Sequence, residues 1–353
     1  MRISFRGVCI VNDMLYNAIN VFLLFIFKII NNEFCLLSNV IPRINHNMGK
    51  TRYNMRGCQL SGADTRPNST LSATNSQRKK HSFYRQLNFP GEHEFAGVIY
   101  DASESGGIYG AKATLNLWNP SVKTGVGIRE YSATQIKIKS GTANAFDVIE
   151  AGWHVYPWYH RAHRRGNEED DKTRFFISWT NDSYQRACYN MDCGGFVMER
   201  NDVLGRALEP TSSYNGEQKE IVVEIWKDIQ LGRWRLKYND IMVGYWPEHL
   251  FTHLRTHGTE VEWGGEVFNN KHNNIFTSTQ MGSGRSAEEG YGKASYFKNQ
   301  RVKTSSSSGH NWISPPTVRG EVSSSDYYTI FADADIDGSG DDGFFYGGPG
   351  NTN

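Results

Sequence analysis

The sequence predicts an all-β protein, an antiparallel β-sandwich of two large packed sheets. The first observation is composition, because 35 glycines, 18 tyrosines and 9 tryptophans among 353 residues favour strands and turns over helices. The second is a succession of short alternating segments bounded by turn residues. The third is that no long helical pattern interrupts them, apart from a turn expected near residues 246–254. A hydrophobic content of 38% is sufficient for a packed core.

The N-terminal part differs from this pattern and divides into two segments. Residues 1–43 contain basic residues followed by the apolar block VFLLFIF, which is typical of a signal or anchor segment but shorter than the ~20 residues that span a bilayer. A poorly delimited N-terminus is the alternative. Residues 44–90 are polar and contain a basic run at 76–81, so we expect an irregular activation or linker segment. Residues 91–353 form the predicted sandwich domain.

Localisation follows from the same N-terminal part. A signal segment implies a secreted protein, extracellular or vacuolar, and contact with a membrane only if an anchor is retained. Two glycosylation sequons, at Asn68 and Asn181, fit this route. The 38 basic and 37 acidic residues nearly cancel, so no nucleic-acid partner is expected.

The expected strands follow one another closely from residue 94 onward. Each is a short apolar or alternating run that ends at Gly, Asn, Asp, Ser or Pro. They cover residues 94–102, 112–120, 133–141, 147–157, 173–180, 193–198, 219–228, 233–240, 241–246, 260–268, 293–302 and 326–334.

Two of these segments, DVIEAGWHV (147–155) and VEWGGEV (261–267), share one pattern. As strands, each places apolar residues on one face and glutamate, glycine and another polar group on the other. The glycines leave room for a peptide substrate or water to approach the sheet, whereas the alternative is that both polar faces are simply solvated. Glu262 and Glu266 lie four residues apart on one strand, roughly 13 Å between Cα atoms, so they cannot share a proton. The natural partner for either of them is Glu150 on the other strand.

Other chemistry has weaker support. Cys188 and Cys193 are close enough for a disulfide-closed loop, and the spacing is a weak zinc signal. The charged segment at 159–171 is expected to be a surface loop, and the Asp/Gly-rich segment at 333–344 matches only the first half of a calcium loop, so we interpret it as a turn. No metal or other cofactor is therefore expected, and no nucleophile motif is present.

Seven ordered motifs carry a family likeness: IEAGWHVYP, TRFFISWT, CYNMDCGGF, VGYWP, VEWGGEV, STQMGSG followed by EEGYGKASY, and FFYGGPG. In this order they resemble the neprosin family of plant proteins, over residues 95–350. The resemblance implies a secreted glutamic endopeptidase that cleaves after proline at acidic pH, with a β-sandwich catalytic domain behind an activation segment. It implies Glu150 and Glu266 as the catalytic dyad, leaves Glu262 as an acid at the rim, and implies a disulfide between Cys188 and Cys193.

The motifs also supply the residues expected to contact a proline-containing peptide or protein substrate, namely Gly152, Trp153, His154, Trp246, Gly264, Gly265 and Gln280. His154 replaces the family's glutamine, and a histidine that charges below about pH 6.5 would lower the pKa of Glu150. The chain departs from the family in having no cysteine after Cys193 and little match before residue 91.

A second hypothesis is a non-catalytic extracellular or cell-wall binding protein of the same family. Exposed Trp118, Trp246 and Trp263 would then bind carbohydrate or a Pro-rich peptide. Both dyad glutamates are present, which favours the peptidase.

Overall fold

The computed structural model describes residues 92–102, 106–163, 170–271, 275–304, 311–338, 340 and 342–352. The chain divides into two units, Met1–Asn75 and Ser76–Asn353, and the described residues all belong to the second. The predictions for residues 1–43 and 44–90, including Asn68, lie outside this part. Among the described residues, no helix combines the length and the apolar character needed to cross a membrane.

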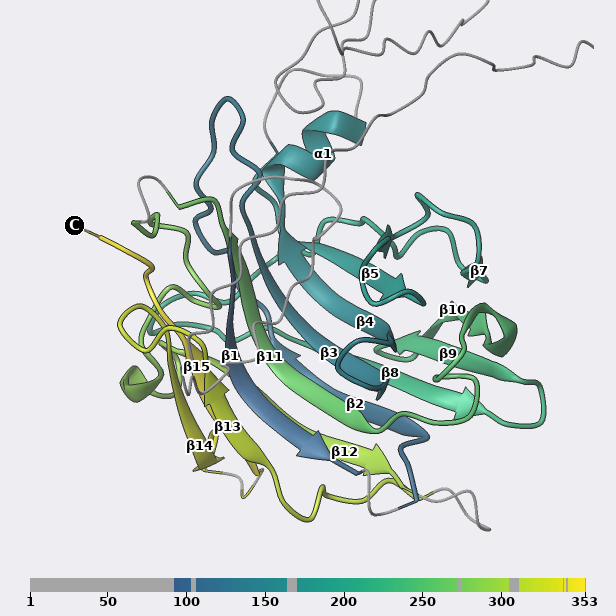
Figure 1. Cartoon of the computed structure of the whole chain (residues 1–353). Coiled ribbons are helices and arrows are strands. Elements are labelled where there is room, and N and C mark those ends of the chain that lie inside the picture. Colours follow the sequence, from purple (N-terminus) through teal and green to yellow (C-terminus); the bar gives the residue numbers. More distant parts are fainter. Residues whose placement is uncertain are drawn as a thin grey trace, which may run out of the picture. The chain divides into compact units, whose positions relative to one another are not determined.

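Two antiparallel sheets form the described domain (Figure 1). The seven-stranded sheet has the order β13-β1-β11-β3-β4-β5-β6, with strands Glu92–Asp101 (β1), Tyr131–Gly141 (β3), Phe146–Val155 (β4), Arg174–Thr180 (β5), Cys188–Tyr189 (β6), Glu260–Asn269 (β11) and Arg319–Val322 (β13). The eight-stranded sheet has the order β14-β15-β12-β2-β8-β9-β10-β7, with strands Gly110–Asn116 (β2), Val197–Met198 (β7), Glu220–Asp228 (β8), Arg233–Tyr238 (β9), Ile241–Pro247 (β10), Ser295–Lys303 (β12), Thr329–Asp335 (β14) and Asp342–Gly347 (β15).

The core lies between the two sheets and follows the alternation of the strands. On β4, Ile149, Ala151 and Trp153 belong to it, and on β11 Val261 and Trp263 do. The facing sheet contributes residues such as Leu115, Val223, Trp234 and Phe297. Because strand side chains alternate between faces, the even-numbered residues of β4 and β11 occupy the outer face of the seven-stranded sheet. This face carries Glu150, Glu262 and Glu266.

The predicted fold class is confirmed, and most of the expected strands are present within a few residues of their expected bounds. The strands β6, β13 and β15 were not predicted. β6 and β13 have only two and four residues, too few to show alternation, and glycines interrupt the pattern of β15. The expected turn contains a 3-10 helix, Glu248–Leu250 (η1), and a second one spans Ala287–Glu289 (η2). The expected surface loop at 159–171 was partly wrong, since it begins inside a helix, Pro157–His163 (α1), whose His160 is buried.

Two minor predictions concern turns. Between β14 and β15, Asp335 Oδ1 accepts hydrogen bonds from the backbone N–H groups of Gly338 (3.0 Å) and Gly340 (3.1 Å), as in an Asp-stabilised turn. The predicted disulfide joins Cys188 and Cys193. Asn181 is exposed at the end of β5, and its side-chain amide donates to Leu250 O at 2.7 Å.

Candidate active site

Three neighbouring strands bring the predicted glutamates together. Strand β3 lies between β11 and β4, so a residue of β3 has one partner on each side. Lys137 of β3 is directly opposite Glu262 of β11 and directly opposite Glu150 of β4. Glu266 lies four residues further along β11, on the same face. The acids therefore come from the two flanking strands, and the strand between them supplies a lysine.

Lys137 Nζ is the centre of the site. It lies 2.9 Å from Glu262 Oε2, 3.8 Å from Glu150 Oε1 and 3.7 Å from Glu266 Oε2. Glu150 Oε1 and Glu266 Oε2 are thus at most 7.5 Å apart, the sum of their two distances to this ammonium. All four side chains are buried, with Glu150 fully so. Burial and the three nearby carboxyl groups act oppositely on Lys137, and the net effect raises its pKa, which keeps it charged.

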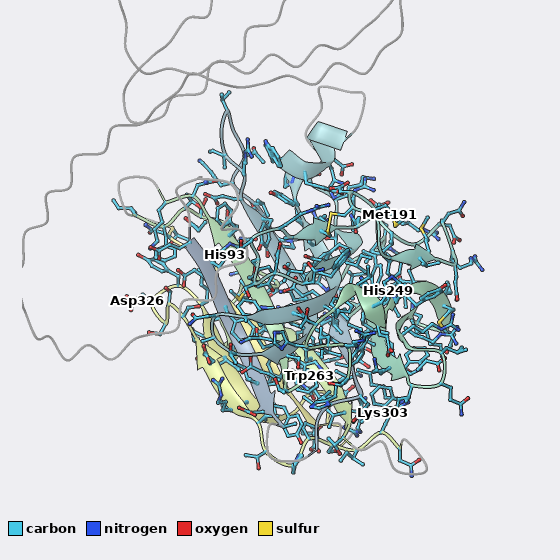
Figure 2. The ribbon with its side chains drawn as sticks, turned by 45° about the vertical axis from the view of Figure 1, so that its right-hand side comes forward. His93, Met191, His249, Trp263, Lys303 and Asp326 are labelled. Atoms are coloured by element: carbon cyan, nitrogen blue, oxygen red, sulfur yellow. A yellow bond between two sulfur atoms is a disulfide. The ribbon has the colours of Figure 1, made fainter. Side chains whose placement is uncertain are left out.

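Hydrogen-bond donors surround both carboxyl oxygens of Glu266. His93 Nδ1 lies 3.0 Å from Oε1, and the Tyr131 hydroxyl donates to the same oxygen. Oε2 accepts from the Gln135 amide at 3.3 Å and faces Lys137. Figure 2 shows His93, near the start of β1, and Trp263 of the neighbouring strand β11. Burial alone would favour a neutral Glu266, but His93, Lys137 and Tyr131 outweigh it and lower its pKa to about 2.

The two oxygens of Glu150 have different surroundings. Oε1 accepts a hydrogen bond from the Tyr184 hydroxyl at 2.6 Å and faces Lys137, whereas Oε2 is buried without a partner among the described residues. Burial raises the pKa of Glu150 to about 8; Lys137 and Tyr184 partly oppose this rise, and the charge of Glu266 adds to it. Since Oε1 already accepts a hydrogen bond from Tyr184 and faces the Lys137 ammonium, we place the proton of the neutral carboxyl on Oε2.

Glu150 and Glu266 are therefore a pair with one protonated and one ionised carboxyl group at the same pH. Glu266 is surrounded by donors, which suits an acceptor-only carboxylate, and Glu150 keeps a proton on an unpartnered oxygen. A pair with pKa values pushed in opposite directions can perform acid and base chemistry together.

The predicted role of the glycines was wrong. A Cβ added to Gly152 would lie 1.9 Å from Thr134 O, and one on Gly264 would lie 2.7 Å from Ala96 O. These glycines let adjacent strands approach each other, and the space beside them is filled by backbone rather than open to a substrate. Gly265 faces the core, where an added Cβ would meet Tyr346 at 2.5 Å and Met281 at 2.7 Å.

Two tryptophans predicted to contact substrate lie in the core instead. Trp153 and Trp246 are both fully buried between the sheets, because they stand on the core faces of their strands. Trp153 donates its indole N–H to Asn116 O at 3.0 Å, and Trp246 packs on Phe196 at 4.7 Å between ring centroids. Gln280 is half-buried, and its side-chain oxygen accepts from the backbone N–H of Ser121 at 2.9 Å.

His154 shares the outer face with the glutamates but has other neighbours. Its ring lies between the Tyr189 hydroxyl and His160, with 3.0 Å between the two histidine Nε2 atoms, and it stacks on Phe176 at 4.8 Å. Burial, followed by the charges of His160 and Arg174, holds the pKa of His154 well below its usual value. The expectation that it charges below about pH 6.5 and lowers the pKa of Glu150 was therefore wrong.

Glu262 was expected at the rim and is instead a buried partner of Lys137, with 2% of its surface exposed. The sequence reasoning also missed Lys137, Tyr131, His93 and Tyr184. Lys137 had a usable signal, because Gln135, Lys137 and Lys139 alternate with Ile136 and Ile138 in a segment predicted to be a strand. His93 and Tyr184 had none, since they lie outside the matched motifs.

Comparison with known proteins gives one family and several solved structures. The family model described as Neprosin matches residues 128–349, more than half of the chain. The structure of SCP-B, described as a member of the eqolisin family of peptidases in a complex with the tripeptide Ala-Ile-His, shares 11% identity at a TM-score of 0.37 and covers 72% of this chain and 98% of its own. The Ruminococcus gnavus IT-sialidase CBM40 bound to alpha2,6 sialyllactose shares 11% identity at a TM-score of 0.25, covering 52% and 90%. At these TM-scores neither structure bears on the chemistry of this chain.

Proposed function

The chain belongs to the neprosin family, and from this premise we propose that it is a glutamic endopeptidase with Glu150 and Glu266 as its catalytic dyad. Family membership supports a peptidase acting on peptides or proteins. One observation of the site supports the dyad most strongly. Two buried glutamates meet around the same ammonium in different surroundings. Several donors hold Glu266 as the carboxylate, whereas burial favours a neutral Glu150, whose Oε2 has no partner among the described residues.

In this mechanism Glu266 is the general base and Glu150 the general acid. The Glu266 carboxylate removes a proton from a water molecule, whose oxygen attacks the scissile carbonyl carbon. Glu150 donates the Oε2 proton to the carbonyl oxygen, which gives a neutral tetrahedral intermediate. When the carbon–nitrogen bond breaks, the leaving nitrogen takes the proton that Glu266 gained, and the intermediate's hydroxyl proton returns to Glu150. No covalent enzyme intermediate forms.

The pH range of activity follows from the two pKa values. Cleavage requires Glu266 without its proton and Glu150 with it, so the dyad is competent between the lowered pKa of Glu266, about 2, and the raised pKa of Glu150, about 8. We propose acidic pH as the working range, with a loss of activity as Glu150 ionises at alkaline pH.

Cleavage after proline and secretion are also proposals, and both rest on the family.

The test uses the full-length chain with a proline-containing fluorogenic peptide between pH 3 and 9. We expect Glu150→Gln and Glu266→Gln each to lower kcat/KM by roughly 10²- to 10⁴-fold, the usual contribution of a general acid or base. Glu260→Gln is the matched control, because Glu260 is on the same strand as Glu266 and pairs with Lys139, outside the dyad. A folded wild-type protein that cleaves no peptide in this range would refute the proposal.

The alternative, a binding protein with exposed tryptophans, has lost its supporting observation. Trp118 is 7% exposed, and Trp246 and Trp263 are fully buried.

A further inference from the structure

Glu262 has the closest contact with Lys137, although it has no place in the dyad. The Lys137–Glu262 distance is 2.9 Å, whereas both dyad carboxyl groups are more than 3.5 Å from the ammonium. Both side chains of this pair are buried, at 4% and 2% exposure. A buried lysine without a partner tends to lose its proton, so an adjacent carboxylate is what keeps Lys137 charged.

The site then holds one ammonium among three carboxyl groups. If Glu262 and Glu266 are ionised and Glu150 is neutral, the net charge of the four groups is −1. If the dyad held a second proton, Glu266 would be neutral and no base would remain. If Glu150 lost its proton, three carboxylates would surround a single cation. The charges of Lys137 and Glu262 thus both influence how many protons the dyad holds.

We propose that Lys137 and Glu262 form a positioning pair that keeps a single proton on the dyad, with the ammonium orienting both catalytic carboxyl groups and Glu262 holding the ammonium in place. This inference rests on the peptidase function proposed above and deepens it. Neither residue contacts the reacting atoms in this scheme, and both act through Glu150 and Glu266.

The two members of the pair have opposite effects on the dyad. The positive charge of Lys137 lowers the pKa of Glu150, and the negative charge of Glu262 raises it. Replacing Lys137 by methionine should therefore raise the pKa of Glu150, and replacing Glu262 by glutamine should lower it. A charge within 4–6 Å typically shifts a pKa by about 1 to 3 units.

The other titratable groups around the pair are few among the described residues. His93 of β1 and Tyr131 of β3 contact Glu266, and Tyr184 from the turn after β5 contacts Glu150. Neither Lys137 nor Glu262 takes part in these three hydrogen bonds, so the variants remove none of them directly.

The experiment measures kcat/KM against pH, from pH 3 to 10, for full-length Glu262→Gln, Lys137→Met and the double variant. The alkaline limb of this profile is the fall in kcat/KM as Glu150 ionises. We expect its midpoint to shift to lower pH by at least about 1 unit in Glu262→Gln and to higher pH by a similar amount in Lys137→Met. In the double variant the two shifts should largely cancel. Lys139→Met and Glu260→Gln are matched controls, since this ion pair (3.1 Å) joins the same two strands one step further from the dyad.

A second readout does not depend on activity. With ¹³C-labelled glutamate side chains, the carboxyl signal of Glu150 can be titrated by NMR in each variant, and its midpoint should move in the same two directions. If the wild type cleaves no peptide but these midpoints move oppositely, the proposed function fails and the positioning pair stands. Both variants could instead lose thermal stability while the alkaline limbs of kcat/KM and the NMR midpoints of Glu150 stay fixed or shift in the same direction. The pair would then have only a structural role, and the inference would be wrong.

Discussion

At the residue scale, two tyrosines have similar bonds with different consequences. Tyr131 is one of several donors to Glu266, so its hydrogen bond adds to a group that is already strongly stabilised as the carboxylate. Among the described residues, Tyr184 is the only side chain that donates a hydrogen bond to Glu150. Its hydroxyl occupies Oε1, which leaves Oε2 for the proton. We infer that Tyr184 orients the acid, while Tyr131 helps to keep the base ionised.

Replacing Tyr184 by phenylalanine tests this orientation. The hydrogen bond from Tyr184 lowers the pKa of Glu150, so its loss should raise that pKa and move the alkaline limb of kcat/KM upward. The free energy of unfolding should fall by about 1 kcal/mol for one lost hydrogen bond. Both are measured on the full-length protein, by pH–rate profiles and by denaturant unfolding.

Tyr214→Phe is the control for this variant. Tyr214 also donates to a glutamate, Glu289 Oε2 at 3.0 Å, but on the exposed surface. The Tyr214→Phe variant should leave the pH profile of kcat/KM unchanged. An unchanged alkaline limb in Tyr184→Phe would show that the hydroxyl does not influence the proton of Glu150.

At the element scale, two glycines let strands of the site's sheet approach their neighbours. In one row across the sheet, Gly264 of β11 and Gly152 of β4 flank Gln135 of β3. The missing side chain of Gly152 lets β4 approach β3, and that of Gly264 lets β11 approach β1. Glu266 and Glu150 lie on either side of this row along their strands. The row of glycines therefore shapes the sheet on which the carboxyl groups converge.

Gly152→Ala should disrupt this packing. The added methyl group would lie 1.9 Å from Thr134 O and 2.8 Å from Gln135 Cα, which are backbone atoms of β3 and cannot move aside as a side chain could. We expect a loss of about 3 kcal/mol or more in the free energy of unfolding, the upper end for overpacking, together with loss of peptidase activity. Denaturant unfolding monitored by tryptophan fluorescence measures the stability.

Gly194→Ala is the control, because an added Cβ there meets nothing within 4 Å. It should be as stable as the wild type within about 0.5 kcal/mol. If both alanine variants were equally stable, the close approach of β3 and β4 would not require glycine.

The strands show what the sequence could predict and what it could not. Alternation identified β4 and β11, their faces, and the need for two glutamates from different strands, because these are local consequences of a two-residue repeat. The order of strands is not local. Only the placement of β3 between β11 and β4 brings Lys137 to Glu150, Glu262 and Glu266. The same limit explains Trp246, where a family motif gave the residue but not the face it occupies.

At the scale of the whole molecule, buried titratable groups link the site to stability. Glu150 has a pKa of about 8 in the folded protein against a usual 4.5, so the folded state binds more protons than the unfolded state between these values. Its contribution therefore lowers stability as the pH rises from 4.5 to 8. His154 acts in the opposite sense, because its pKa lies well below 6.5 and the unfolded state binds more protons. Its contribution raises stability as the pH approaches 6.5 and is constant above that.

Glu266 completes this balance. Its pKa is lowered to about 2, so it contributes stability above pH 4.5 that is lost as the pH falls towards 2. Between pH 4.5 and 6.5 the slopes of Glu150 and His154 oppose each other. Above pH 6.5 only the slope of Glu150 remains among these three groups.

We therefore expect the melting temperature of the wild type to change little between pH 4.5 and 6.5 and to fall between pH 6.5 and 8. For one titrating group, the free energy of unfolding falls by at most about 1.4 kcal/mol for each unit that the pH rises. In Glu150→Gln the neutral amide cannot ionise, so the fall should disappear and the variant should be more stable than the wild type at pH 8. Glu260→Gln should follow the wild type. Thermal unfolding from pH 4 to 9 measures all three proteins, and parallel curves for wild type and Glu150→Gln would mean that Glu150 is already ionised at acidic pH, which would also remove it as the general acid.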